Sequence, residues 1–271
     1  MLRFIAVVLL FVEAAAGINA GEPVYVPHGA GELGMAFTSS AFPGHWSCFH
    51  NQALLAKQVT TSAAVALETR YMLSSLSSKA LSIAVAGNTA PIGIILTHYG
   101  NGDYYRIFSG AGSAVKITDG LALGIQVDYI TERSVGDYRD QSHITFEAGA
   151  IMDIASDMTV GLHILNPLNS LNSIPSAVNA GVAWRQSDDL CIAAELSKVT
   201  AEPLSFHAGI NWNIMDKLVL RSGYMSSPSS FAVGSGFRSG KMQVDAGFLI
   251  NSVTGITSSV SFIWTIGGKE G

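Results

Sequence analysis

YYRIFSGAGSAVKITDGLALGIQVDYITE, residues 104–132, is the stretch that decides the fold. Its two alternating runs meet at Asp119-Gly120, a dipeptide typical of the two-residue turn of a β-hairpin. On both arms one face is apolar, while the other carries charged side chains and glycine. The arms are long enough for the roughly 9–11 residues that a tilted membrane-spanning strand needs. The stretch therefore predicts a hairpin with its apolar face toward lipid and its polar face toward water.

The composition of the whole chain agrees with a place in a membrane. Of its 271 residues, 48% are hydrophobic and only 13% are charged, whereas roughly 25% of an ordinary soluble domain is charged. After residue 20 no apolar run approaches the ~18–20 residues of a membrane helix. Since only helices and closed barrels satisfy every backbone polar group in lipid, we expect an all-β transmembrane barrel. The net charge of −5, without any basic cluster, argues against a nucleic-acid partner.

Three regions follow one another along the chain. Residues 1–20 have a basic start at Arg3, an apolar core and small residues before a cut after Ala20, the pattern of a secretory signal peptide. Residues 21–60 lack alternation and are too apolar for a solvated tail, so we expect them to fold back as a plug inside the barrel. Residues 61–271 are the predicted outer-membrane β-barrel. The apolar side chains expected to pack inside the plug are Leu33, Met35, Phe37, Trp46, Phe49 and Leu54.

The period of two predicts about fourteen antiparallel strands after Ser62. Short turns alternate with longer polar links such as 133–141 and 166–176, and outer-membrane barrels have short turns on the periplasmic side. An even number of strands then puts both chain ends in the periplasm of a bacterium, with outer-membrane lipid around the wall. The predicted strands are 62–73, 79–88, 91–98, 104–117, 120–132, 142–153, 158–165, 177–186, 189–198, 204–214, 217–225, 230–238, 240–250 and 255–266.

In the predicted strands, charged side chains occupy the positions that alternate with the apolar ones. We call this set of positions the polar parity. A basic side chain that faces lipid at the midplane costs about 2–4 kcal/mol, and the exceptions, Lys79, His98 and Lys198, lie near strand ends where this cost fades. Seven acids balance seven bases, so we interpret the set as a paired wall network rather than a selectivity filter. The side chains expected in the lumen are Glu68, Arg70, Arg106, Lys116, Asp128, Glu132, His143, Glu147, Asp153, His163, Arg185, Glu195, His207, Arg221, Arg238, Lys241 and Asp245.

Glycine recurs on the same lumen parity. Because glycine weakens strands, its repeated use predicts that something approaches the wall closely from inside. The glycines concerned are Gly110, Gly112, Gly124, Gly149, Gly161, Gly181, Gly209, Gly223, Gly234, Gly236 and Gly247.

Three other interpretations have less support. His45, Cys48 and His50 are close enough in sequence to suggest soft-metal ligands, but no fourth ligand is evident. Cys48 could also pair with Cys191 across the periplasmic mouth.

A barrel lipid hydrolase would need a nucleophile with a positioned base, and no set stands out from the general polar lining, so we predict no enzyme. Phosphate loops, dinucleotide fingerprints and CxxC are missing, so no cofactor is expected. The sets that share a face are Ser205 with His207, and His143 with Glu147 and Asp153.

Two N-terminal motifs carry a family resemblance. GELGMAF at 31–37, followed by NQALL at 51–55, resembles the signature of the FadL-like superfamily, especially the PorV/PorQ-type outer-membrane proteins of Bacteroidetes. Gln52 stands where that pattern usually has proline. The resemblance extends through 164–167, 190–198, 206–209 and 221–224 and implies a fourteen-stranded barrel with an N-terminal hatch and no catalytic residues. It assigns to the hatch the motif residues Gly31, Leu33, Gly34, Met35, Asn51, Gln52 and Ala53.

The resemblance implies two roles. Members of the superfamily move hydrophobic molecules across the outer membrane or serve the type IX secretion machinery. We predict transport or binding of a hydrophobic small molecule, because the loops are short for the capture of large partners. The alternative is a non-enzymatic barrel that works with secretion-system subunits. Pro91 and Gly93 in the third predicted strand could weaken pairing and open a lateral path, and a turn boundary explains Pro91 equally well.

Overall fold

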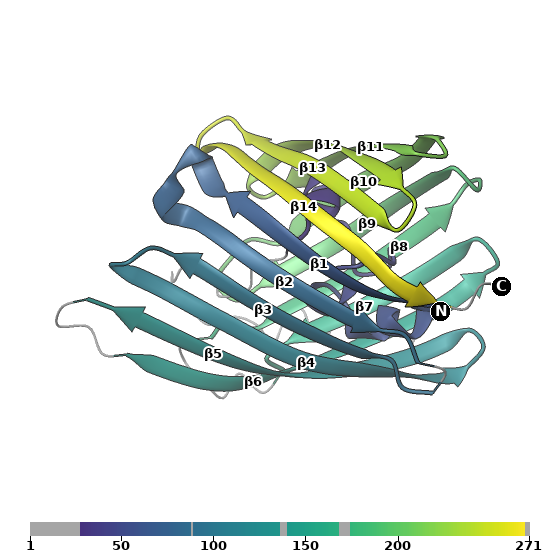
Figure 1. Ribbon diagram of the computed structural model, residues 1–271, viewed down its shortest axis with the longest axis horizontal. Helices are drawn as coiled ribbons and strands as arrows, with labels where there is room; N and C mark the ends of the chain where they lie inside the picture. Colours follow the sequence, from purple (N-terminus) through teal and green to yellow (C-terminus); the bar gives the residue numbers. More distant parts are fainter. Residues whose placement is uncertain (1–27, 88, 136–139, 168–173, 269–271) are drawn as a thin grey trace.

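The computed structural model describes residues 28–87, 89–135, 140–167 and 174–268, and these form a closed barrel of fourteen antiparallel strands (Figure 1). Each strand pairs with its neighbours in sequence, and β1 closes on β14 with Thr60 opposite Gly268. The predicted all-β fourteen-stranded barrel is confirmed. The strands are β1 Thr60–Thr69, β2 Ser77–Val85, β3 Ile92–Gly100, β4 Tyr104–Thr118, β5 Leu121–Ser134, β6 Gln141–Ala155, β7 Met158–Leu165, β8 Ala177–Arg185, β9 Leu190–Val199, β10 Ser205–Met215, β11 Leu218–Ser226, β12 Ser229–Ser239, β13 Met242–Asn251 and β14 Gly255–Gly268.

The first strand ends earlier than the sequence predicts. β1 stops at Thr69 instead of residue 73, and a 3₁₀ turn, η3 Arg70–Met72, follows it. Tyr71 and Met72 have φ angles of 53° and 60°, which are left-handed values that a strand cannot contain. A second 3₁₀ turn, η4 Ser74–Leu76, leads into β2. Arg70 therefore lies just beyond the strand, at the rim of the barrel.

Side chains alternate between the two faces of the wall as predicted. In β5 the side chain of Ile125 is 69% exposed, whereas its neighbour Gln126 is 1% exposed. Lys79 and His98 face outward and lie opposite each other, close to the ends of β2 and β3. Because the hydrogen-bond ladder closes on itself, the apolar outer face meets lipid without an unpaired strand edge.

The two mouths of the barrel differ less than the sequence suggests. We call the mouth with the β4–β5 and β12–β13 turns the turn mouth, and the opposite one the loop mouth. At the loop mouth β11 and β12 are joined by only Ser227-Pro228, and at the turn mouth β2 and β3 are joined by the longer stretch 86–91. The ends of β1 and β14 meet at the turn mouth. Trp184, Trp212 and Trp264 lie on the outer face near this mouth.

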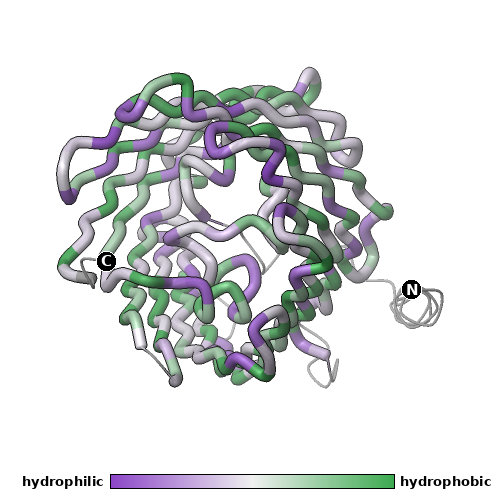
Figure 2. Tube along the Cα trace, turned by 90° about the vertical axis from the view of Figure 1, so that its right-hand side faces the viewer, coloured by the Kyte–Doolittle hydropathy of each residue, from purple (hydrophilic) through white to green (hydrophobic). Residues whose placement is uncertain are grey.

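Residues 28–57, the inner segment, lie inside the wall (Figure 2). The segment contains the short helix α2 Ala30–Gly34 and the 3₁₀ helices η1 Ser47–Phe49 and η2 Gln52–Lys57. None of the described helices has the length and apolar character of a membrane span. The predicted signal peptide at 1–20, its predicted cleavage site and the first residues of the predicted plug lie outside the described residues. Of the apolar side chains predicted to pack here, Phe37 is only partly buried, and those fully buried are Leu33, Met35, Trp46, Phe49 and Leu54.

Part of the barrel interior is apolar, which the alternation of charges did not predict. Ile95, Phe108 and Ile130 point inward and pack in one cluster with Trp46 and Phe49 of the inner segment. The lumen near β1–β5 is thus filled by an ordinary hydrophobic core. Burial of such side chains away from water stabilises the position of the segment.

The lumen glycines make room for the inner segment. A Cβ atom added to Gly223 would lie 2.5 Å from the carbonyl carbon of Met35 and 2.7 Å from the amide nitrogen of Ala36. A Cβ atom added to Gly234 would lie 3.0 Å from the Cα of Gly34. Inner-segment atoms also crowd Gly124, Gly149, Gly161, Gly181, Gly209 and Gly247, whereas wall side chains face Gly110, Gly112 and Gly236.

A methyl group at Gly223 should displace the inner segment while the wall still forms. Overlap with the backbone of Met35 and Ala36 cannot be relieved by a rotamer change, so we expect Gly223→Ala to weaken docking by about 1–3 kcal/mol. Limited proteolysis in detergent should then cleave the segment faster, with heat-modifiable electrophoretic mobility as the check that the barrel has formed. Gly267→Ala is the control, since a Cβ there meets nothing within 4 Å. Equal protection of the segment in the two variants would contradict the packing.

Candidate functional site

Within the described part of the chain, the inner segment separates a loop-side cavity from a turn-side cavity. The loop-side cavity has a volume of about 210 Å³ and opens toward the loop mouth. The turn-side cavity has a volume of about 240 Å³ and opens toward the turn mouth. Leu33 lines the first cavity and Met35 lines the second. The partition between the cavities therefore includes a stretch of only a few residues around the end of α2.

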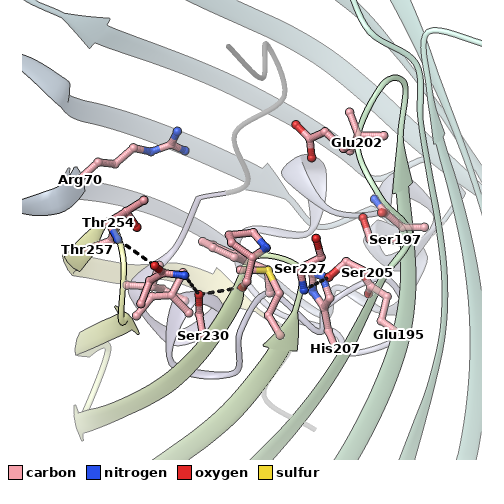
Figure 3. Close-up of a pocket in the computed structure, with 18 of the residues that line it drawn as sticks. Arg70, Glu195, Ser197, Glu202, Ser205, His207, Ser227, Ser230, Thr254 and Thr257 are labelled. Carbon is pink, nitrogen blue, oxygen red and sulfur yellow. Dashed lines mark hydrogen bonds between the residues drawn. The ribbon is translucent and has the colours of Figure 1, made fainter. Parts of the chain in front are cut away.

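The loop-side cavity combines an apolar lining with neutral hydrogen-bonding groups (Figure 3). Its apolar side chains come from both the inner segment and the wall, and its hydroxyl, amide and imidazole groups come mainly from β8–β14. This combination is typical of small-molecule sites, in which a few polar groups orient a largely apolar ligand. The apolar set includes Leu33, Phe37, Tyr71, Met225, Pro228 and Leu249, and the neutral polar set includes His50, Asn179, Ser205, His207, Ser230 and Thr257.

Three charged groups of the loop-side cavity, Glu68, Arg70 and Glu195, already have partners. Arg70 Nε lies 3.1 Å from Glu68 Oε1, and its guanidinium carbon lies 5.8 Å from the centre of the Tyr99 ring. Glu195 Oε2 accepts hydrogen bonds from the backbone amides of Ser39 at 3.0 Å and Ser40 at 2.8 Å. Glu195 therefore holds the inner segment in place, while the Glu68–Arg70 pair borders the cavity near the rim.

The turn-side cavity is more strongly charged. Arg221 donates to Asp245 Oδ1 at 2.8 Å and to Asn211 Oδ1 at 2.9 Å. Gly31 lies against this guanidinium, because a Cβ on it would be 3.1 Å from Arg221 Cζ. Glu32 also lines the cavity, and burial raises its pKa to about 7. The turn side thus contains one firmly paired arginine and one acid that titrates close to neutral pH.

A buried polar cluster ties η2 to the wall between the cavities. Glu147 lies 2.7 Å from His163 Nε2 and accepts from Gln126 Nε2 at 3.2 Å. Gln126 also donates to Asp128 at 2.8 Å, and Gln52 of the inner segment donates to Glu147. Buried charges need such partners, since each unpaired one would carry a large desolvation penalty. The cluster acts as an anchor for the segment.

The Asn51-Gln52-Ala53 motif forms the start of η2. Asn51 caps the helix by accepting from the Ala53 amide at 3.1 Å, and it donates to the Ser40 carbonyl at 2.7 Å. Gln52 occupies the first helical position, which proline also suits. Glutamine can therefore replace the proline of the family pattern without changing the turn, and its side chain adds bonds to Glu147 and to the Cys48 carbonyl at 3.0 Å.

The structure divides the predicted lumen residues among several places. Arg106 pairs with Glu132 at 2.6 Å on the loop side, and Lys57 of the inner segment pairs with Asp153 at 2.5 Å. Sequence reasoning missed Asn179 and Asn211, two uncharged amides; their alternation with the apolar positions of β8 and β10 was the available signal. Glu68, Arg70, Glu195 and His207 line the loop-side cavity; Arg221 and Asp245 line the turn-side cavity; Asp128, Glu147 and His163 lie in the buried cluster; and Lys116 and Arg185 are exposed at the turn mouth.

The metal and disulfide interpretations find no matching geometry. Within the described ranges, no group of three or more His, Cys, Asp or Glu side chains is arranged to hold a metal ion. His50 Nε2 donates to a backbone carbonyl 2.8 Å away, and burial raises the pKa of the Cys48 thiol to about 12. Cys48 and Cys191 are both free thiols.

The residues considered for a hydrolase do not form a nucleophile and base. Ser205 Oγ accepts from the backbone amide of Ser227 at 3.1 Å, and no hydrogen bond joins it to His207 in the described part of the chain. Asp153 is paired with Lys57 and lies in a different region from His143, which is 3.2 Å from Gln141 at the start of β6.

The proposed weak point in the third strand is also not present. β3 pairs with β2 and with β4 along its length without a register shift. Pro91 precedes the strand, so its missing amide does not interrupt the ladder. Gly93 is inside the strand, where Leu55 and Cys48 of the inner segment fill the space beside it. The ladder at β3 is therefore closed to lateral passage.

Comparisons with known proteins support the fold. No protein-family model matches the sequence, and no curated protein matches it. The structure is similar to the Ralstonia pickettii toluene transporter TbuX, with a TM-score of 0.72, 12% identity, and coverage of 89% of this chain and 99% of that one. It is similar to the CymD monoaromatic hydrocarbon channel, with a TM-score of 0.69, 13% identity, and coverage of 91% and 99%. A Pseudomonas aeruginosa FadL homologue gives a TM-score of 0.66, 11% identity, and coverage of 90% and 100%. At these identities the likeness shows the shared barrel fold.

Docking of α2 should depend on pH through Glu32. Burial is the largest effect on Glu32 and raises the pKa of its carboxyl group from 4.5 to about 7. The charge of Arg221 acts in the opposite direction and lowers this pKa, whereas the charge of Asp245 raises it. Above pH 7 the ionised Glu32 carboxylate destabilises the docked state of α2. This destabilisation disappears as the pH falls toward 4.5, and the free energy of docking changes by roughly 3 kcal/mol at most. Hydrogen exchange of residues 28–37, corrected for intrinsic rates, should therefore be slower at pH 5 than at pH 8.

Glu32→Gln is the matched test of this dependence. Glutamine keeps the shape of the side chain and cannot ionise, so the exchange of residues 28–37 should become nearly independent of pH. A variant that keeps the full pH dependence would show that another group is responsible.

Proposed function

We propose that this chain is a non-enzymatic outer-membrane barrel that binds hydrophobic small molecules in its loop-side cavity and passes them through the lumen. The observation that carries the proposal is this cavity, which is open at one mouth and lined largely by apolar side chains such as Leu33, Phe37 and Leu249. An apolar protein cavity of about 150 Å³ holds a benzene molecule. A volume of about 210 Å³ therefore suits a ligand with a single aromatic ring or a short alkyl chain.

The similar structures support the same class of ligand. TbuX is described as a toluene transporter and CymD as a monoaromatic hydrocarbon channel. Both barrels resemble this one over nearly their whole length. A fold can host several functions, so the cavity of this chain, rather than its fold, indicates the ligand.

The route that we propose runs along the barrel axis. All fourteen strand pairs of the described wall are hydrogen-bonded, and the register shifts lie close to strand ends at the turn mouth. A ligand in the loop-side cavity therefore reaches the turn side by displacing the partition around Leu33 and Met35. Hydrogen bonds to Glu147 and Glu195 hold residues 39–57 against the wall. In contrast, α2 packs closely against Gly234 and Gly247, and in the described residues no side-chain hydrogen bond fixes it there.

The orientation and the partners belong to the same proposal. With the loop mouth outside the cell, the ends of β1 and β14 face the periplasm, and outer-membrane lipid surrounds the apolar belt. The role of a type IX secretion accessory, as in PorV/PorQ-type proteins, is less favoured. Links such as Ser227-Pro228 at the loop mouth offer little surface to a large partner.

Uptake of labelled toluene by intact bacterial host cells tests the proposal. Cells that produce the barrel should take up toluene faster than host cells without it. Leu33→Ala should increase the rate further, because truncating this buried side chain weakens the partition by about 2–5 kcal/mol. Leu123→Ala on the outward face is the control and should behave like the unmodified protein. Uptake equal to that of the host alone would contradict the proposed function.

A further inference from the structure

We infer that the loop-side cavity takes an uncharged ligand that carries one hydrogen-bonding group on a small apolar body, such as a single-ring alcohol, and discriminates against carboxylates. This inference deepens the proposed function and rests on it. Three features of the cavity carry it: the balance of its charges, its hydrogen-bonding groups without partners, and the position of its apolar surface.

The charges of the lining oppose a carboxylate. Glu68, Glu195 and Glu202 contribute three acids to the lining, against one base, Arg70. Arg70 is already paired with Glu68 at 3.1 Å, and Figure 3 shows Arg70 and Glu202 on opposite sides of the cavity. A ligand carboxylate would enter without a free cation to pair with it and would lose its hydration. Burying a charge in this way is strongly unfavourable.

The two buried acids of the lining, Glu68 and Glu195, do not favour a cationic ligand either, and the third, Glu202, is exposed. Glu195 is satisfied by the amides of Ser39 and Ser40, at 3.0 and 2.8 Å. Glu68 has one oxygen paired with Arg70. Since the cavity already contains a guanidinium next to one of its acids, an ammonium group would meet both attraction and repulsion. A neutral ligand leaves these pairs as they are.

Within the described residues, three buried polar atoms of the lining have no hydrogen-bond partner. One is Oγ of Ser40 in the inner segment. The two on the wall are Nδ1 of His207 and Oε2 of Glu68, whose side chains are among the buried polar residues. Leaving a buried polar atom without a hydrogen-bond partner is energetically unfavourable. A hydroxyl group can both donate and accept, so it can satisfy either of the two wall atoms. In Figure 3 His207 lies beside Ser205 and Glu195, on the wall strands of the cavity.

The cavity also provides an apolar surface against which the hydrocarbon part of the ligand can pack. Leu33 and Phe37 reach the cavity from the inner segment, and Met225 and Leu249 reach it from β11 and β13. A hydrocarbon can therefore bind through these side chains alone, but it leaves the His207 and Glu68 atoms unpaired. We expect the order of affinity to be benzyl alcohol, then toluene, then benzoate.

Equilibrium dialysis of the full chain in lipid nanodiscs tests this order with those three probes at pH 7.5, with empty nanodiscs as the blank. Benzyl alcohol should bind about 10-fold more tightly than benzoate, which corresponds to about 1.4 kcal/mol. His207→Leu should lower the affinity for benzyl alcohol relative to that for toluene, because Nδ1 of His207 is no longer available to the hydroxyl group. Glu68→Gln should release Arg70 and increase benzoate affinity. Lys116→Ala, which removes a charge outside both cavities, should change none of the three.

The ranking of the probes on the unmodified chain decides the inference even if a variant fails to fold. Benzoate bound as tightly as benzyl alcohol, or a His207→Leu barrel that keeps an undiminished preference for benzyl alcohol, would overturn the inference and leave the proposed function standing. Binding of none of the three probes above the blank would overturn the proposed function itself.

Discussion

In a lipid bilayer every backbone N–H and C=O group must find its partner within the protein, and the rest of this structure depends on that constraint. The chain meets it by closing fourteen strands into one ladder, with Thr60 opposite Gly268 at the join. Closure gives each strand one face toward lipid and one toward the lumen. The sequence must then alternate, and the outward Ile125 beside the inward Gln126 shows the result. A closed wall also creates an interior that has to be filled.

Residues 28–57 fill that interior by two kinds of contact. On one side, Trp46 and Phe49 pack with inward apolar side chains such as Phe108. On the other, the carboxylates of Glu147 and Glu195 accept hydrogen bonds from the segment. Lumen glycines allow the backbone of the wall and the backbone of the inner segment to approach each other closely. The glycine content of the wall therefore reflects the packing of the segment against it. Because the segment crosses the lumen without filling it, two cavities with different chemistry remain, one largely apolar and one dominated by Arg221 and Asp245.

The number and order of strands could be predicted from the sequence, because a period of two persists through each strand and most charged side chains lie on its lumen face. The lumen glycines similarly predicted a close approach from inside. Other features depend on contacts between distant residues. The early end of β1 follows from the left-handed Tyr71 and Met72, and the inward Ile95 and Ile130 pack on a segment whose position no local pattern shows. The cavities could not be predicted either, since β1, β8–β14 and the inner segment form the loop-side cavity only after closure.

Alternate side chains of one strand face lipid and the lumen, and this alternation, together with closure of the ladder, produces the barrel and its cavities. Spin labels placed one at a time along residues 121–132 of β5 in lipid vesicles test it most directly. The account predicts that collision rates with dissolved oxygen oscillate with a period of two, with maxima at 123, 125, 127 and 129, where the side chains are exposed on the outer face. Collision rates without that period, or maxima at the inward positions 124, 126 and 128, would contradict it.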